Sequence, residues 1–220
     1  MSEPIPPSEP IKVDIWSDIA CPWCYIGKRR FETGVAKAGE NVVVEYHSFE
    51  LAPDTPVDFD GSTVEFLQRR MGTSAAQVEQ RLQQVTDIAA AEGLAWDMAA
   101  VRHSNTRKAH RLLHHAKAEG RQSELKERLL RAHFEQGRNV GRDEELAELA
   151  VEVGLDRDRV LAVLSGDDYE DAVERDVQLA RQYGIQGVPF FVIDGKYGVS
   201  GAQEADSFVQ VLRTVRAGGE

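Results

Sequence analysis

The chain has 220 residues, with 26 Lys and Arg against 37 Asp and Glu, which gives a formal net charge of −11. This acidic balance excludes non-specific nucleic-acid binding and a basic membrane anchor. Hydrophobic residues make up 42% of the sequence, enough to bury a core in one domain or in one domain with an insertion. No run of about eighteen apolar residues is present, so we predict no transmembrane helix and no membrane partner.

Residues 1–10 are acidic and rich in proline, and we predict a flexible leader there. They lack the charged n-region and the apolar h-region of a secretory signal. We therefore expect a cytoplasmic protein, although the mature form of an exported protein would have the same appearance.

The first half of a predicted α/β unit follows. Alternating apolar residues predict a strand over residues 11–17, and apolar residues three and four apart predict a helix over 22–38 that ends near Gly39. Residues 42–49 are β-branched and aromatic, which predicts a second strand parallel to the first, joined to it by a βαβ crossover. Two prolines predict a loop over residues 51–60.

From Ser62 to about Tyr183 the pattern is helical throughout. Capping boxes begin at Ser62 and Ser74, the helix after the second box is closed by Gly93, and the helical pattern begins again at Thr106. Asp143 is a candidate N-cap, a short helix is predicted over 160–164, and the last helix of the block, which begins at Tyr169, ends at Gly184. We interpret residues 62–183 as an all-helical insertion.

The strand pattern then returns over residues 189–193. Asp194-Gly195 predicts a type I′ hairpin to a strand over 197–200, and an amphipathic helix over 205–215 closes the chain. Residues 11–61 and 184–220 are therefore predicted to form one α/β domain around the insertion.

The chain's two cysteines, Cys21 and Cys24, form a C-P-W-C motif at the junction between the first predicted strand and the first predicted helix. Unpaired N–H groups and the helix dipole favour a thiolate at Cys21, at the helix start. Cys24 lies one turn on, in the apolar stripe, and is expected to be covered and less acidic. An exposed attacking sulfur and a buried resolving sulfur are what thiol–disulfide exchange requires.

Two other interpretations of this motif are weaker. Packing alone poorly explains two cysteines at a strand-to-helix junction. A metal site would need about four ligands, and neither a second cysteine pair nor a shared histidine spacing is present, so we predict no metal.

Four spaced motifs resemble the DsbA-type thiol oxidoreductases, specifically the FrnE-like branch: residues 18–27 (DIACPWCYIG), 104–110 (SNTRKAH), 187–191 (GVPFF) and 200–203 (SGAQ). The resemblance implies a thioredoxin-like fold with a helical insertion and a dithiol/disulfide oxidoreductase, extending to isomerase activity. It also implies a cis bond at Val188-Pro189, facing the cysteines, with the Val188 backbone free to pair with an extended substrate.

Related families of similar fold do not match as well. Kappa-class glutathione transferases and hydroxychromene-carboxylate isomerases usually carry a serine at the position of Cys21. Some FrnE-like proteins carry further cysteines, which this chain lacks, so a second internal disulfide relay is excluded.

Further candidates surround the motif. Pro22 and Trp23, between the cysteines, are expected to contact substrate, and Trp23 is alternatively a lid over Cys24. Asp18 is a turn residue or sets the local charge. Two other candidates occur in the second motif: Asn105 either contacts substrate or caps a helix, and His110 is expected to be a hydrogen-bonded core histidine.

The turn from Ser200 to Gln203 precedes the last helix. Its amides would hold the carboxylate of a small thiol, or simply cap the helix.

Three functions remain open. The first is an oxidoreductase acting on protein or small-molecule disulfides through Cys21 and Cys24, with no permanently bound cofactor and with a thiol or a reductase as recycling partner. The second is a thiol-cofactor transferase or isomerase, and the third is a chaperone-like binding module. Cys24 argues against the second, since a transferase does not need a resolving sulfur. The sequence does not determine the oligomeric state.

Overall fold

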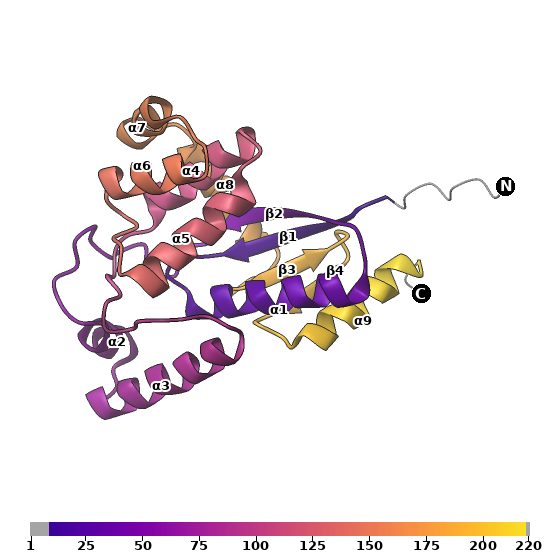
Figure 1. Cartoon of the computed structure of the whole chain (residues 1–220), viewed down its shortest axis with the longest axis horizontal. Coiled ribbons are helices and arrows are strands. Elements are labelled where there is room, and N and C mark those ends of the chain that lie inside the picture. Colours follow the sequence, from indigo (N-terminus) through magenta and orange to yellow (C-terminus); the bar gives the residue numbers. More distant parts are fainter. Residues whose placement is uncertain (1–8, 219–220) are drawn as a thin grey trace.

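The computed structural model describes residues 9–218, so most of the predicted leader lies outside the described residues. The elements, in chain order, are β1 (Ile11–Ser17), α1 (Pro22–Ala38), β2 (Val42–Ser48), α2 (Thr63–Met71), α3 (Ala75–Ala91), α4 (Arg107–Ala118), α5 (Gln122–Gln136), α6 (Asp143–Glu152), α7 (Arg157–Ser165), α8 (Glu170–Gln182), β3 (Phe190–Ile193), β4 (Tyr197–Ser200) and α9 (Ala205–Arg216) (Figure 1).

The sheet has the order β2-β1-β3-β4, with β1 parallel to β2 and the other two pairs antiparallel. Ile15 lies opposite Tyr46 on one side and Phe191 on the other, so strands from both ends of the chain meet at β1. Asp194 and Gly195 have φ angles of 54° and 66°, as the predicted type I′ turn requires.

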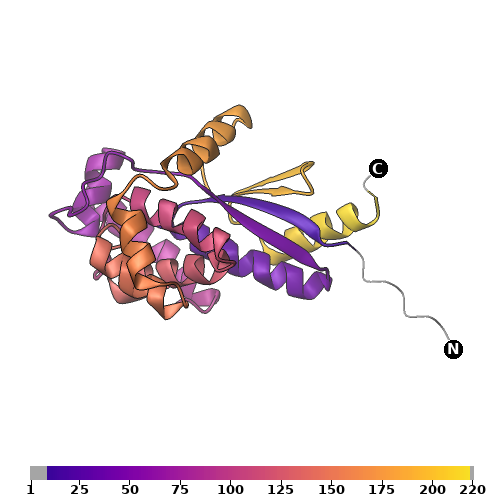
Figure 2. The ribbon, with the colours of Figure 1, turned by 90° about the horizontal axis from the view of Figure 1, so that it is seen from above.

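The two faces of the sheet are covered by different helices (Figure 2). Val13 and Ile15 pack with Phe31 of α1 and Phe208 of α9 on one face. Trp16 packs on the other face, and its ring N–H donates to the carbonyl of Asp176 in α8 at 3.1 Å. This alternation follows from the period of two in a strand.

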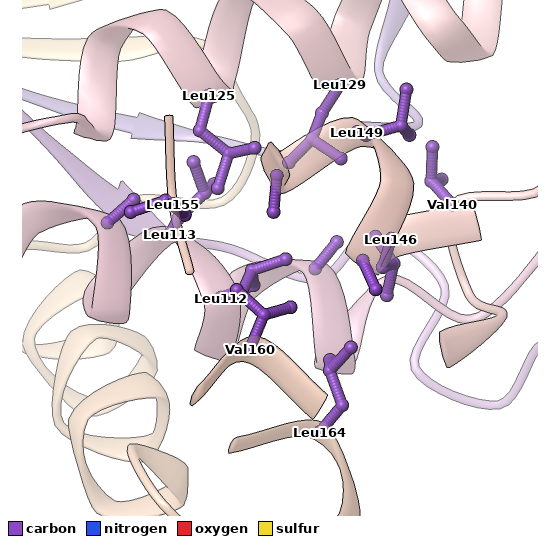
Figure 3. Close-up of a cluster of buried hydrophobic side chains, with 14 of the residues drawn as sticks. Leu112, Leu113, Leu125, Leu129, Val140, Leu146, Leu149, Leu155, Val160 and Leu164 are labelled. Atoms are coloured by element: carbon purple, nitrogen blue, oxygen red, sulfur yellow. The ribbon is translucent and has the colours of Figure 1, made fainter. Parts of the chain in front are cut away.

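Helices α4 to α7 bury a leucine-rich core of their own, beyond the end of β1 (Figure 3). The edge strand β2 is joined to this core by Gln122 of α5. Its side chain accepts from the Tyr46 N–H and donates to the Tyr46 carbonyl, both at 2.9 Å. Gln122 thereby satisfies edge groups that would otherwise be exposed, and it orients α5 toward the sheet.

Most predicted boundaries agree with the structure to within a few residues, including both capping boxes. The predicted end of a helix at Gly93 and the return of the helical pattern at Thr106 agree with the structure, in which residues 92–106 contain no helix. Gly93 adopts φ 77° after α3, and the Asp97 N–H then bonds to the carbonyl of Phe134 instead of continuing a helix. Asp143 is the first residue of α6, after Arg142 at the N-cap, and pairs with Lys108.

Candidate active site

The two cysteines lie at the start of α1, at the end of the sheet nearest the helical core (Figure 1). Cys21 is the N-cap residue and Pro22 opens the helix, where the missing N–H of proline costs nothing. The Cys24 N–H donates to the Cys21 carbonyl at 3.1 Å, so the sulfurs lie one helical turn apart. Both residues are free thiols and each is only 3% exposed. The expectation of an exposed Cys21 was therefore wrong.

The loop before β3 covers Cys21. The Cys21 thiol donates to the Val188 carbonyl at 3.4 Å, across 167 residues of sequence. The Val188-Pro189 peptide bond is cis. Gly27 of α1 is in close contact with this loop, since a Cβ there would lie 2.8 Å from Cγ of Pro189. The first and third sequence motifs therefore meet at one point.

The acid–base properties of the pair differ from the sequence prediction. The Cys24 sulfur, followed by burial, raises the pKa of Cys21. Burial works against ionisation of Cys24 too, but its contact with Cys21 and the charge of Lys126 outweigh burial and lower the pKa of Cys24. After the first ionisation the two sulfurs share the remaining proton, and the structure favours the thiolate at Cys24, where the sequence favoured Cys21.

Lys126 is the residue that the sequence analysis missed. Its side chain is fully buried, and Nζ has no hydrogen-bond partner among residues 9–218. It lies 5.7 Å from the centre of the Tyr46 ring. Burial lowers the pKa of Lys126, while the sulfur of Cys24 and the carboxylate of Asp18 act in the opposite direction. Lys126 follows Gln122 by one helical turn, so the contact that fixes Gln122 against β2 also aims Lys126 at the cysteines.

Asp18 is both a turn residue and a buried charge. Its carboxylate accepts from the backbone N–H groups of Ala20 and Leu51 at 3.4 and 2.9 Å, and it lies 3.2 Å from Nε2 of His110. Burial opposes ionisation, but His110 and the Leu51 N–H outweigh burial and hold the pKa of Asp18 at about 2. His110 is therefore the hydrogen-bonded core histidine that was predicted, and its partner links the second motif to the first.

Comparison with known proteins identifies the family. Residues 12–213 match the family described as "DSBA-like thioredoxin domain". The chain belongs to this family. It is 44% identical to a probable DsbA oxidoreductase from Streptomyces coelicolor, whose crystal structure superposes with a TM-score of 0.88 over 96% of this chain and 91% of that one.

Two further relatives are more distant. The protein YwbO of Bacillus subtilis (strain 168) is 28% identical over 204 residues, which are 92% of this chain and 96% of that protein. The cytosolic disulfide reductase DsbM from Pseudomonas aeruginosa, solved with GSH, shares the fold with a TM-score of 0.64 at 18% identity, over 94% of this chain and 99% of that one. The DsbA-like chain thus has the predicted thioredoxin-like fold with a helical insertion, and its family is that of the thiol–disulfide oxidoreductases.

Of the remaining predicted site residues of this DsbA-like protein, Trp23 and the turn from Ser200 to Gln203 lie near the cysteine motif. Trp23 is 42% exposed beside the cysteines, which suits contact with substrate better than a lid. The turn from Ser200 to Gln203 adjoins the site, because the Gly201 N–H donates to the Pro189 carbonyl at 2.9 Å. The Gln203 side chain closes this turn on the Ser200 carbonyl at 2.8 Å.

Asn105, in contrast, holds the fold together. Its side-chain oxygen accepts from the Arg107 N–H at 2.9 Å at the start of α4, and its amide donates to the Pro53 carbonyl at 2.8 Å. These bonds are those of a helix-capping residue that anchors the loop before α2, which is the second of the two roles expected for Asn105.

One group of side chains has the composition of a metal site. Asp14, Glu45 and His47 bring ligand atoms within 4.8 Å of one another on the sheet. Lys12 lies 3.2 Å from Asp14, and Lys117 pairs with Glu45 at 2.5 Å. Two lysines already neutralise these carboxylates, so the cluster is an ion-pair network, and we assign no metal to it.

Membrane insertion through a helix finds no support in the described part of the chain, where every helix is too short or too polar to span a bilayer.

Proposed function

We propose that this protein is a dithiol oxidoreductase in which Cys21 attacks the substrate disulfide and Cys24 resolves the mixed disulfide. The observation that carries the proposal is the Cys21 thiol at the start of α1, held against the Val188 carbonyl, with Cys24 one turn behind it beside a buried lysine. The substrate would pair with the Val188 backbone, and Pro22, Trp23 and Pro189 would border the reacting sulfur.

The reaction balances as a two-electron exchange. The Cys24 thiolate takes the proton from Cys21, and the resulting Cys21 thiolate attacks one substrate sulfur. A Cys21–substrate disulfide forms, and the other substrate sulfur leaves as a thiolate and takes up a proton. Cys24 then gives up its proton and attacks the Cys21 sulfur, the bond between Cys21 and the substrate breaks, and the second substrate sulfur leaves as a thiolate that takes up this proton. The substrate disulfide is reduced, and the protein dithiol is oxidised to a disulfide. The same steps in reverse oxidise a substrate dithiol.

Lys126 would act at the resolving step. A buried ammonium favours a thiolate at Cys24 and so lowers the free energy needed to ionise it for the second attack. The charge of Lys126 lowers the pKa of Cys24, whereas the charge of Asp18 raises that of Cys21. We propose a cytoplasmic location, where the dithiol would be the resting form, and a small thiol or a reductase as its recycling partner.

A trapping experiment tests this mechanism. Cys24→Ser is expected to accumulate a mixed disulfide on Cys21 in cell extract, visible on non-reducing gels and by intact mass. A ladder of protein adducts indicates protein disulfides, which we favour, and a single small mass indicates a small thiol. Cys21→Ser is the matched control, and it is expected to trap nothing and to lose insulin reduction with dithiothreitol.

The same variants test the other functions. If Cys24→Ser traps nothing and retains full turnover with a thiol cofactor, the protein is a transferase or isomerase. If both cysteine variants still suppress aggregation of unfolded chains while the wild type reduces no disulfide, it is a binding module.

A further inference from the structure

The turn from Ser200 to Gln203 is held in one conformation by its own residues. Gly201 has a φ of 79°, in the left-handed region that glycine adopts without strain. The Gln203 N–H donates to the Gly201 carbonyl at 3.0 Å, and the Gln203 side chain donates to the Ser200 carbonyl at 2.8 Å. The Gly201 N–H donates to a residue outside the turn, at 2.9 Å to the Pro189 carbonyl. A well-defined turn thus contacts the loop that covers Cys21.

Helix α1 lies beside the segment between β4 and α9 and contacts the turn at two points (Figure 1). Ala202 packs on Gly27, where a Cβ would lie 3.4 Å from both Cα and Cβ of Ala202. Nη1 of Arg30 donates to the Ala202 carbonyl at 2.9 Å. Gly27 and Arg30 are three residues apart and so share one face of the helix. The helix that carries the cysteines therefore also fixes the turn that contacts Pro189.

A carboxylate at the end of α3 orients Arg30 for this bond. Nε of Arg30 donates to Glu92, the C-cap residue of α3, at 2.6 Å. The side chains of Arg30 and Glu92 are only 14% and 21% exposed, so this ion pair is largely shielded from water. Glu204, which is well exposed, contacts Nη1 at 2.7 Å. The donors of a guanidinium lie in one rigid plane, so the bond from Nε to Glu92 also determines where Nη1 points.

The Pro189 backbone transmits the position of the turn to Val188. The proline ring locks φ at about −65°, and the peptide bond that joins Pro189 to Val188 is planar. The ring lies against Gly27, where a Cβ would be 2.8 Å from Cγ of Pro189, and the Pro189 carbonyl is held by the Gly201 N–H. Because Pro189 is fixed at its ring and at its carbonyl, the Val188 carbonyl has little freedom to move. It accepts from the Cys21 thiol at 3.4 Å.

We propose that Arg30 is a positioning residue for disulfide exchange, because it holds the Val188 backbone, through the turn, where an extended polypeptide substrate pairs with it. The proposal rests on the proposed function, since it takes Cys21 as the attacking sulfur and Val188 as the pairing residue. When Cys21 loses its proton, the Val188 carbonyl loses that donor and becomes free to accept from a substrate N–H. Pairing then sets the distance between the substrate disulfide and the Cys21 sulfur, on which the rate of attack depends steeply.

Methylated peptides measure this pairing. The first substrate is a peptide whose single cysteine forms a mixed disulfide with 2-mercaptoethanol. The second is the same peptide with methyl groups on the backbone nitrogens of the cysteine and of its two neighbours, which removes the N–H groups that the Val188 carbonyl would accept. The disulfide is the same in both. We expect the wild type to reduce the unmethylated peptide with a kcat/KM about tenfold higher, which corresponds to about 1.4 kcal/mol.

Arg30→Met keeps the apolar stem of the side chain but donates no hydrogen bond. We expect this variant to lose at least half of that free energy, which leaves a preference of about threefold or less. A general loss of stability would lower the rates with both peptides by the same factor and leave the preference unchanged. Arg29→Met is the matched control, because Arg29 is the preceding residue of α1 and forms its ion pairs with Glu32 and Glu127. Its preference should equal that of the wild type.

The outcomes separate the two proposals. A wild type without a preference, a full preference in Arg30→Met, or an equal loss in Arg29→Met overturns the role of Arg30, while loss of turnover in Cys21→Ser still upholds the dithiol mechanism. Turnover that survives Cys21→Ser overturns the proposed function itself. If Arg30→Met fails to fold, Arg30→Met with Glu92→Gln decides, because this pair of substitutions leaves no unpaired carboxylate at the end of α3. A full preference in the double variant contradicts the proposal.

Discussion

At the residue scale, a charge from a distant helix adds to the contact with Cys21 in lowering the pKa of Cys24. Lys126 is fully buried, has no hydrogen-bond partner in the described chain, and lies where its charge favours a Cys24 thiolate. A buried ammonium without a counter-charge destabilises a fold by about several kcal/mol. The Asp18 carboxylate and a Cys24 thiolate both favour the charged form of Lys126, and of these two only the thiolate forms and disappears during the reaction.

Lys126→Met is expected to raise the pKa of the first thiol ionisation, because the thiolate loses a neighbouring cation. The thiolate absorbance near 240 nm, followed against pH in the reduced protein, measures this shift. Lys117→Met, which removes an exposed lysine paired with Glu45, is the control and should leave the titration unchanged. A titration unaltered by Lys126→Met would contradict the assignment.

His133 gives the protein a predictable sensitivity to acid. It is completely buried, and both ring nitrogens lack partners within residues 9–218. Burial, assisted by His103, lowers its pKa from 6.5 to about 3. Below pH 6.5 the unfolded chain therefore binds a proton that the folded protein does not bind, and stability falls as the pH falls toward 3.

From pH 7 to pH 5 this single residue is expected to remove about 2 kcal/mol of stability. His133→Phe cannot bind the proton, so its loss of stability over the same interval should be smaller by that amount. Urea unfolding at the two pH values measures the difference, and comparing the change with pH cancels any general effect of the substitution on packing. An identical loss in variant and wild type would show that His133 is not the titrating group.

Lys126 also marks the limit of what the sequence could reveal about the site. The C-P-W-C motif and Val188-Pro189 carry local signals, and the structure brings them together. Lys126 lies 102 residues after Cys24, in a stretch that has the pattern of an ordinary amphipathic helix. Its burial depends on the docking of Gln122 against β2, and no local pattern contains that long-range contact. The reversed acidity of the two cysteines depends on the contact between their sulfurs, on their burial and on the charge of Lys126, so it too could not be predicted.

At the element scale, Gly34 determines how closely α1 packs against α9. At Gly34 a Cβ would lie 2.7 Å from Cβ of Phe208 and 2.8 Å from the Ala205 carbonyl oxygen of α9. Neither atom is the end of a flexible side chain, so one helix would have to move. α1 carries both cysteines, and this contact therefore sets the position of the motif relative to the sheet.

Gly34→Ala is expected to destabilise the protein by about 1–2 kcal/mol. Overpacking costs about 1–3 kcal/mol, whereas the better helix propensity of alanine returns up to about 1 kcal/mol. Thr33→Ala, at the adjacent exposed position of the same helix, should change stability by less than about 0.5 kcal/mol. Urea denaturation of both variants measures the effect, and a Gly34→Ala protein as stable as Thr33→Ala would refute the close-packing argument.

Prediction of the elements from the sequence succeeded where the signals were local. The helix over 22–38, its end at Gly39, both capping boxes and the type I′ turn depend on neighbouring residues, and the structure has them all. The lack of helix between Gly93 and Thr106 was predictable, but the path of this segment was not, because the Asp97 N–H bonds to the carbonyl of Phe134, 37 residues later.

At the scale of the whole molecule, Asp176 joins the sheet to the helical region. Its carboxylate accepts from the Ser48 N–H at 2.7 Å and contacts His47 and His114 at 2.8 and 2.9 Å. Burial opposes its ionisation, but the two histidines and the Ser48 N–H outweigh burial and lower the pKa of Asp176. One carboxylate from α8 thus binds β2 and α4 together.

Asp176→Asn is expected to lower the free energy of unfolding by about 2–4 kcal/mol at pH 7, because a buried carboxylate is lost from three partners at once. The wild-type advantage is present above pH 3.8, the ordinary value for this carboxyl, and disappears as the pH falls through the lower folded value. The difference between the two proteins should therefore be smaller at pH 3 than at pH 7.

Urea unfolding at both pH values checks this prediction. Asp206→Asn removes an exposed carboxylate that pairs with Lys37 and should cost less than about 1 kcal/mol. A difference between Asp176→Asn and wild type that is constant with pH would exclude the role assigned to its ionisation.

The meeting of Cys21 with Val188 also has a consequence during protein synthesis. Ribosomes add roughly 5–20 residues per second, so the 167 residues that separate the two take roughly 10–30 s to make. During that time Cys21 and Cys24 have left the ribosome, while the loop that covers Cys21 does not yet exist. The order of elements therefore exposes both thiols of the nascent chain to oxidants and to the cysteines of other newly made proteins. A reducing environment at the ribosome keeps them free until the last fifth of the chain arrives.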